Sequence, residues 1–157
     1  MFGKPSIMTR IAVGKGVGLI FGLMAFFMIP AFAPGVSPLI HWGVLFWYVT
    51  MGAIIGMYGV LNWNPMLKFS MPWWVMGPLI GGWMNFVLAF FAYDALRTIT
   101  ISFFGAAGTG ISPFWIVLEG VIIGGIIDYL CTRFGGEGIE TVTAVTPPEK
   151  GGASLSH

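Results

Sequence analysis

Charge is what this sequence lacks most. Lys, Arg, Asp and Glu together make up 8% of its 157 residues, whereas a typical soluble domain contains about 25% charged residues. Hydrophobic residues make up 57%, so lipid must be the solvent for most of the surface. The net charge of +1 supplies no basic field that would attract nucleic acid. We therefore exclude nucleic-acid binding and expect membrane lipid to be a partner.

Cysteine and histidine are also scarce. The single cysteine, Cys131, cannot form a disulfide within the chain, and two widely separated histidines cannot complete a zinc framework. His41 could ligate a metal or haem, but no second internal histidine accompanies it, and we interpret it as an interfacial residue of an aromatic belt. We predict no metal site, and the sequence encodes no cofactor, so contacts with lipid, quinone or pigment would come through partner chains.

Long apolar runs, in contrast, are abundant. About 20 mostly apolar residues cross the hydrocarbon core of a membrane as a helix, and four windows meet this requirement: about 11–29, 39–61, 73–93 and 113–132. The segments between them are rich in Pro, Gly, Asn and Ser, which end helices, and connections this short make successive helices antiparallel neighbours. The sequence predicts an all-α integral membrane protein whose residues 1–134 form a four-transmembrane-helix antiparallel bundle.

The distribution of Lys and Arg predicts the orientation. Basic residues concentrate in cytoplasmic segments, and here all but one fall on the same side of the four spans: Lys4, Arg10, Lys15, Lys68, Arg133 and Lys150. Only Arg97 lies on the other side. We expect both termini to be cytoplasmic and the membrane to be a bacterial inner (cytoplasmic) membrane.

Tryptophans support the same orientation. Interfacial belts are enriched in Trp, and the pattern assigns three to each interface: Trp42, Trp47 and Trp115 outside, and Trp63, Trp73 and Trp74 inside. Trp83 is the exception, because it falls in the middle of the third span.

Glycines recur four residues apart in every span. Small residues at this spacing let helix backbones approach closely within lipid, where there is little hydrophobic force between helices. The pattern predicts close helix packing but does not say whether the neighbouring helix belongs to this chain or to another. The predicted packing residues are Gly14, Gly18, Gly22, Gly52, Gly56, Gly77, Gly81, Gly120 and Gly124.

Two acids lie inside the fourth span. Glu119 and Asp128 are on opposite helix faces and about 13 Å apart along the axis, so they cannot form a paired-carboxylate site. Asp128 continues the line of Gly120 and Gly124. Its depth matches that of Lys15 in the first span, so either these two residues pair within the bundle or each reaches the interface independently.

Glu119 lies deeper, about 9 Å below the start of its helix. An intramembrane acid is costly when it is charged and unpaired, so Glu119 is either protonated or partnered. Candidate partners on the outer side are Arg97, His41 and Asn85, of which Arg97 offers an ion pair. The functional alternative is a carboxyl group that exchanges a proton or cation with a substrate.

Two segments outside the spans are informative. Residues 97–104 alternate polar and apolar side chains, which indicates either a short extended segment or a helix end lying along the interface. Residues 135–157 are low in large apolar residues and rich in Gly, Pro, Thr and Ser, as disordered segments are. We expect an extended low-complexity C-terminal tail and, if it is ordered, contact between it and a partner chain.

These patterns favour a non-catalytic integral membrane subunit that packs into and stabilises a larger inner-membrane complex, for which an energy-transducing assembly is a natural host. Glycine stripes on every span, few charges and an aromatic-rich, lipid-binding surface suit an accessory subunit in contact with other membrane subunits.

Two other interpretations remain. The alternative is a homo-oligomeric small transporter or channel that uses Glu119 as a proton- or cation-coupling carboxylate, with Trp83, Asn85 and Trp115 lining its cavity. An enzyme acting on lipid would have to use His41, Asp94 and Ser112. Asp94 and Arg97 are more simply a surface pair on one helix face, so we expect no enzyme.

Overall fold

The computed structural model describes residues 6–60, 63–64, 69–136, 138 and 141. Within these ranges, four helices are long and apolar enough to cross a membrane: Ile7–Phe32, Pro38–Tyr58, Trp73–Phe91 and Pro113–Gly135. They fall on the four predicted windows, the first and last running a few residues longer than expected. Because a chain in lipid must satisfy its own backbone hydrogen bonds, apolar segments of this length fold as helices. The chain is therefore a helical membrane protein.

The elements follow in a simple order. Helices α1 (Ile7–Phe32) and α2 (Pro38–Tyr58) are followed by two short strands, β1 (Trp63–Asn64) and β2 (Phe69–Ser70), which pair antiparallel. Helix α3 (Trp73–Phe91) leads into α4 (Tyr93–Phe104). Two 3₁₀ turns, η1 (Gly105–Gly110) and η2 (Pro113–Trp115), then precede α5 (Ile116–Gly135).

Local chemistry sets several of these boundaries. Ser37 and Ser112 each precede a proline, and their hydroxyls accept hydrogen bonds from the backbone N–H groups of Leu39 and Phe114. This serine-proline arrangement starts a helix, because the proline lacks the N–H that would go unpaired there. Helix α5 ends before Gly136, whose φ of 79° is a conformation that glycine adopts readily.

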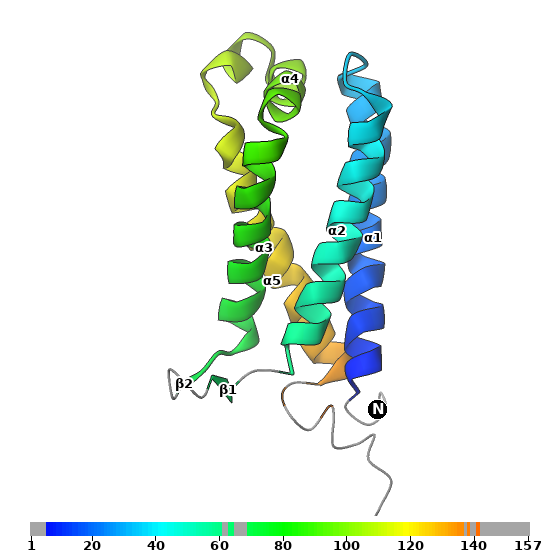
Figure 1. The fold of residues 1–157 in the computed structure, drawn as a ribbon, viewed down its shortest axis with the longest axis vertical. Coiled ribbons are helices and arrows are strands. Elements are labelled where there is room, and N and C mark those ends of the chain that lie inside the picture. The colour runs from blue at the N-terminus through cyan, green and yellow to red at the C-terminus, as the bar shows by residue number, and fades with distance from the viewer. Residues whose placement is uncertain (1–5, 61–62, 65–68, 137, 139–140, 142–157) are drawn as a thin grey trace, which may run out of the picture.

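The helices form two closely packed pairs (Figure 1): α1 packs against α2, and α3 packs against α5. Helix α5 leaves α3 and reaches α1 at the end of the molecule where β1 and β2 lie, which we call the β1–β2 end. The core between the pairs contains Met51 and Ile55 of α2 and Ile123, Ile127 and Cys131 of α5.

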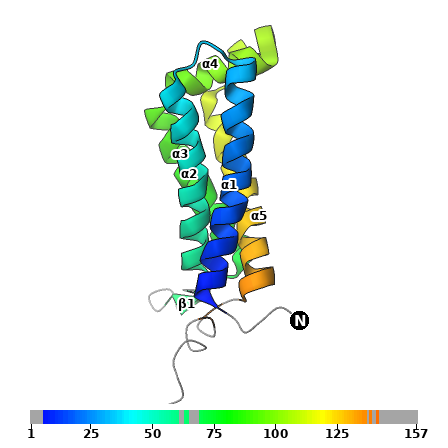
Figure 2. The same ribbon diagram turned by 90° about the vertical axis from the view of Figure 1, so that its right-hand side faces the viewer.

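Residues 97–104 belong to a helix rather than to an extended segment. Figure 2 shows α4 lying across the other end of the molecule, at a steep angle to the spanning helices; we call this the α4 end. The predicted tail, residues 135–157, lies almost entirely outside the described residues, and so does its predicted contact with a partner chain.

Candidate functional site

The glycine stripes pack helices of this chain against one another. A side-chain carbon added at Gly14 or Gly52 would overlap the carbonyl oxygen of the other residue, so α1 and α2 touch through their backbones. Gly77 and Gly124 meet in the same way between α3 and α5. The rest of the predicted packing glycines also face a neighbouring helix at close range: Gly18, Gly22, Gly56, Gly81 and Gly120. The stripes therefore serve contacts inside the chain.

A buried arginine joins three helices at the β1–β2 end. Arg10 of α1 has no exposed surface, and its Nη2 donates to Oδ1 of Asp128 at 2.6 Å. Its Nε donates to the Gly56 carbonyl of α2 at 3.1 Å, and its Nη1 donates to Thr132 Oγ1 at 3.1 Å and to the Gly136 carbonyl. The guanidinium thus donates to α2, to α5 and to the residue that follows α5.

This arrangement differs from both alternatives considered for Asp128, which neither pairs with Lys15 nor reaches the surface, being 1% exposed. Lys15 is exposed, and the cation that meets Asp128 is Arg10. Arg10 lies four residues before Gly14 and therefore on the face that meets α2 and α5, whereas Lys15 is turned about 100° away from Gly14. Arg10 is consequently a buried structural residue and not one of the peripheral charges that report orientation.

A second polar network links α2, α3 and α5 nearer the α4 end. Asn85 is 1% exposed; its amide donates to the Ile116 carbonyl at 2.9 Å and its Oδ1 accepts from Trp47 Nε1 at 3.1 Å. Trp47 was predicted to mark the outer interface, but its indole N–H donates a hydrogen bond inside the molecule. All polar atoms of this contact serve to hold the helices together.

Glu119 pairs with a tyrosine and not with Arg97. The hydroxyl of Tyr48 donates to Glu119 Oε1 at 2.9 Å, and among the described residues Tyr48 is the only hydrogen-bond partner of this carboxylate. Arg97 is exposed on α4 and lines a separate surface depression of about 160 Å³. Among the described residues the expected ion pair is not formed, because Arg97 lines that depression and not the crevice that contains Glu119.

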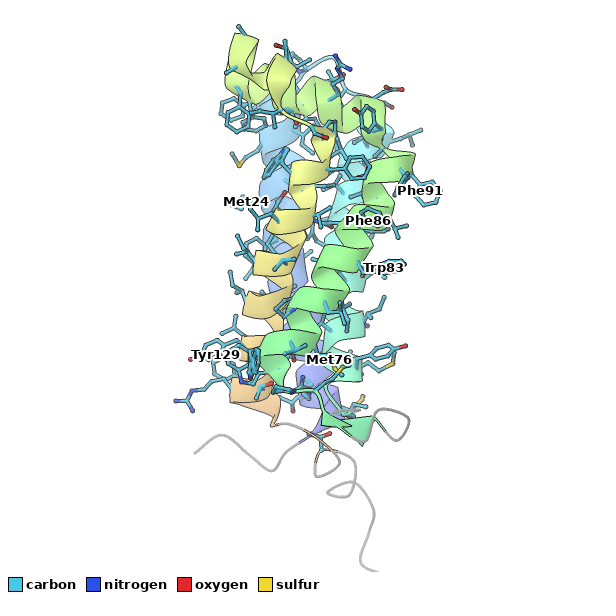
Figure 3. All side chains as sticks on the ribbon, turned by 90° about the vertical axis from the view of Figure 1, so that its left-hand side faces the viewer. Met24, Met76, Trp83, Phe86, Phe91 and Tyr129 are labelled. Atoms are coloured by element: carbon cyan, nitrogen blue, oxygen red, sulfur yellow. The ribbon has the colours of Figure 1, made fainter. Side chains whose placement is uncertain are left out.

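That crevice lies between α1, α2 and α5 and is covered by α4. It has a volume of about 270 Å³, and its lining is apolar except for a few side chains. Its polar lining residues are Tyr48, Thr100, Trp115 and Glu119. Asn85 is not among them, and neither is Trp83, which points outward from α3 (Figure 3).

The remaining candidates do not come together. His41 is half-buried beside the Phe26 ring. The Ser112 hydroxyl accepts a hydrogen bond from the Phe114 N–H and so caps the helix that follows. Asp94 is exposed in the first turn of α4. Within the described ranges, no hydrogen bond joins these three residues, and no cluster of His, Cys, Asp and Glu could hold a metal ion.

An exposed aromatic stripe runs along α3. Leu79, Trp83, Phe86 and Phe90 lie within about 60° of one another around the helix, and Trp83 is 65% exposed. Phe86 packs edge-on against Phe90 with ring centroids 5.0 Å apart. Figure 3 shows Trp83 pointing away from the other helices.

Comparison of the chain with protein-family models, with curated proteins and with solved structures found no match in any of the three. The functional proposal therefore rests on the chain's own geometry.

Proposed function

We propose that this chain is a non-catalytic membrane subunit that packs into and stabilises a larger inner-membrane complex, for which an energy-transducing assembly is a natural host. In this proposal the four spans form an antiparallel bundle with both termini in the cytoplasm. The β1–β2 end then faces the cytoplasm and the α4 end faces the outside. The aromatic stripe on α3 is the surface that meets another subunit.

Trp83 is the observation that carries this proposal. It lies at the middle of α3 and is 65% exposed, and its indole N–H donates no hydrogen bond to any of the described residues. Tryptophan prefers the membrane interface, where its N–H reaches water or headgroups. At mid-membrane depth lipid tails offer no acceptor. A neighbouring protein that presents one would satisfy the N–H and cover the surrounding rings.

The glycine contacts point in the same direction. Because the stripes are already used within the chain, small residues are not available on those faces to pack a partner. A contact surface can instead be built from large side chains, and the α3 stripe supplies one. Aromatic residues are enriched in protein interfaces and among the residues that dominate binding.

Replacing Trp83 with alanine tests this interface. Central aromatic residues contribute at least about 2 kcal/mol to binding, so Trp83→Ala should weaken co-purification of partner polypeptides about thirtyfold. Trp74→Ala is the matched control, because Trp74 is 63% exposed on the same helix but near its end. Its yield of partners should stay within threefold of the wild type. Full retention of partners by Trp83→Ala would refute the interface.

The second candidate is a homo-oligomeric transporter or channel that uses Glu119. It is favoured by one specific observation: Glu119 lines the crevice and has Tyr48 rather than a cation as its partner. Intramembrane acids mark proton and ion pathways in many transporters. On this proposal Glu119→Gln abolishes transport into vesicles while leaving the oligomer intact, and a fully active variant would eliminate it.

A further inference from the structure

The crevice beneath α4 presents an acceptor without a matching donor. Three of its lining side chains can donate a hydrogen bond, and each already does so inside the molecule. Tyr48 donates to Glu119, Trp115 donates to Thr100 at 3.3 Å, and Thr100 donates to the Leu96 carbonyl at 2.8 Å. Among the described residues, nothing donates a hydrogen bond to the second carboxylate oxygen of Glu119. A molecule entering the crevice therefore finds a carboxylate to interact with and no unused donor.

The charge of the lining agrees with this hydrogen-bond pattern. Among the described residues that line the crevice, Glu119 is the only acidic or basic one, since neither Lys, Arg nor His is among them. Aromatic side chains from four helical elements line the same crevice as the carboxylate: Phe21, Tyr48, Phe103, Phe104 and Trp115. Aromatic faces attract cations, most strongly where water is excluded. Carboxylate and rings together favour a positively charged group.

The mouth of the crevice opens at the side of the molecule. Met24 of α1 and Phe104 of α4 line it and are 53% and 52% exposed, and Figure 3 shows Met24 on the outer surface. A side opening in a membrane protein faces lipid, so a ligand that partitions into the membrane can enter without crossing the bundle. The 270 Å³ volume is near the lower limit for small-molecule pockets.

We propose that this crevice binds a lipophilic organic cation, with its cationic group at Glu119 and its apolar body among Phe21, Met24 and Phe104. Anionic headgroups would face an uncompensated carboxylate, and quinone carbonyls would require a donor that the lining has already used. A cation compensates the carboxylate and requires no hydrogen-bond donor from the lining. This proposal rests on the crevice of the second candidate function and names the class of ligand that it takes. Binding to the isolated chain can be measured without partner subunits and without transport.

Saturable binding of radiolabelled octylammonium tests the site. The purified chain is placed in phosphatidylcholine nanodiscs, and binding to empty nanodiscs is subtracted. We expect saturable binding that octanol and octanoate, of equal chain length, fail to displace at the same concentration. Absence of saturable binding would overturn the proposal. Displacement by octanol as effective as by unlabelled octylammonium would also overturn it, because the site would then not recognise charge.

Two variants separate the site from general partitioning. Glu119→Gln should weaken octylammonium binding at least tenfold, whereas Asp94→Asn removes an exposed carboxylate outside the lining and should leave affinity unchanged. Equal binding by Glu119→Gln and the wild type would refute the role of the carboxylate. If Glu119→Gln does not fold, Ala25→Phe decides: it fills the crevice and keeps Glu119, so it should abolish binding, and retained binding would refute the location.

Discussion

At the scale of single residues, Arg10 determines how the helix pairs are joined. Its guanidinium is fully buried and donates to Asp128, to Thr132 and to the Gly56 and Gly136 carbonyls. Removing one partner of a buried ion pair leaves an uncompensated charge and costs about 3–5 kcal/mol. We predict that Arg10→Met lowers the free energy of unfolding by about this amount, measured by denaturant titration in mixed micelles.

Lys15→Met is the control for that prediction. Lys15 lies on the same helix but is exposed, and substitutions of this kind usually change stability by less than about 0.5 kcal/mol. The double variant Arg10→Met, Asp128→Asn should lose less than the sum of the two single changes, because the partners interact directly. Equal losses from Arg10→Met and Lys15→Met would show that the buried pair does not stabilise the protein.

The sequence contained signals for both polar partners that were missed. Arg10 lies four residues before Gly14, and Tyr48 lies four residues before Gly52, so both continue glycine stripes. Extending those stripes would have placed both side chains on interior faces. Depth matching selected Lys15, and charge matching selected Arg97. Depth and charge take no account of a residue's angular position around the helix axis, and that position determines which side chains are in contact.

At the scale of helices, backbone contact between glycines holds α1 against α2. A methyl group at Gly52 would overlap the Gly14 carbonyl, and forcing extra atoms into a packed contact costs about 1–3 kcal/mol. We predict this loss for Gly52→Ala, measured as the free energy of unfolding in micelles. Gly43→Ala is the matched control on the same helix, since an added carbon there meets no atom within 4 Å.

Gly43→Ala should be neutral or stabilising by up to about 1 kcal/mol, because alanine restricts the unfolded backbone more than glycine does. If Gly52→Ala proved as stable as Gly43→Ala, the close α1–α2 contact would not exist in the folded protein. Which helix each stripe contacts could not be predicted, because the four-residue spacing is the same in all four spans.

The positions of the spans were predictable from length and hydropathy alone. The crossing of α5 from α3 to α1 was not, since length and hydropathy do not reveal the Arg10 contact with Asp128 that joins α1 to α5. The crevice could not be predicted either, because it depends on how the helices are arranged. Helix α5 meets α1 at the β1–β2 end, and α4 lines the space that remains near the α4 end. The alternating pattern of residues 97–104 was compatible with either a helix end or an extended segment, and the structure shows a helix.

At the scale of the whole molecule, the orientation in the membrane can be measured by labelling. Cys131 is fully buried, so a cysteine introduced elsewhere is the reactive one. We predict that Thr109→Cys, exposed at the α4 end, reacts with a membrane-impermeant maleimide in intact cells. Thr9→Cys, exposed near the start of α1, should react only after the membrane is permeabilised. The opposite pattern would reverse the proposed orientation.

The central claim is that this chain works as a subunit of a larger membrane complex. The most direct measurement is the native mass of the chain, purified in mild detergent through a C-terminal tag, together with its visible absorption spectrum. We predict co-migration with other membrane polypeptides, and haem or pigment bands if the host complex contains them. A colourless particle built only from copies of this chain would contradict the claim and leave the Glu119 transporter as the better account.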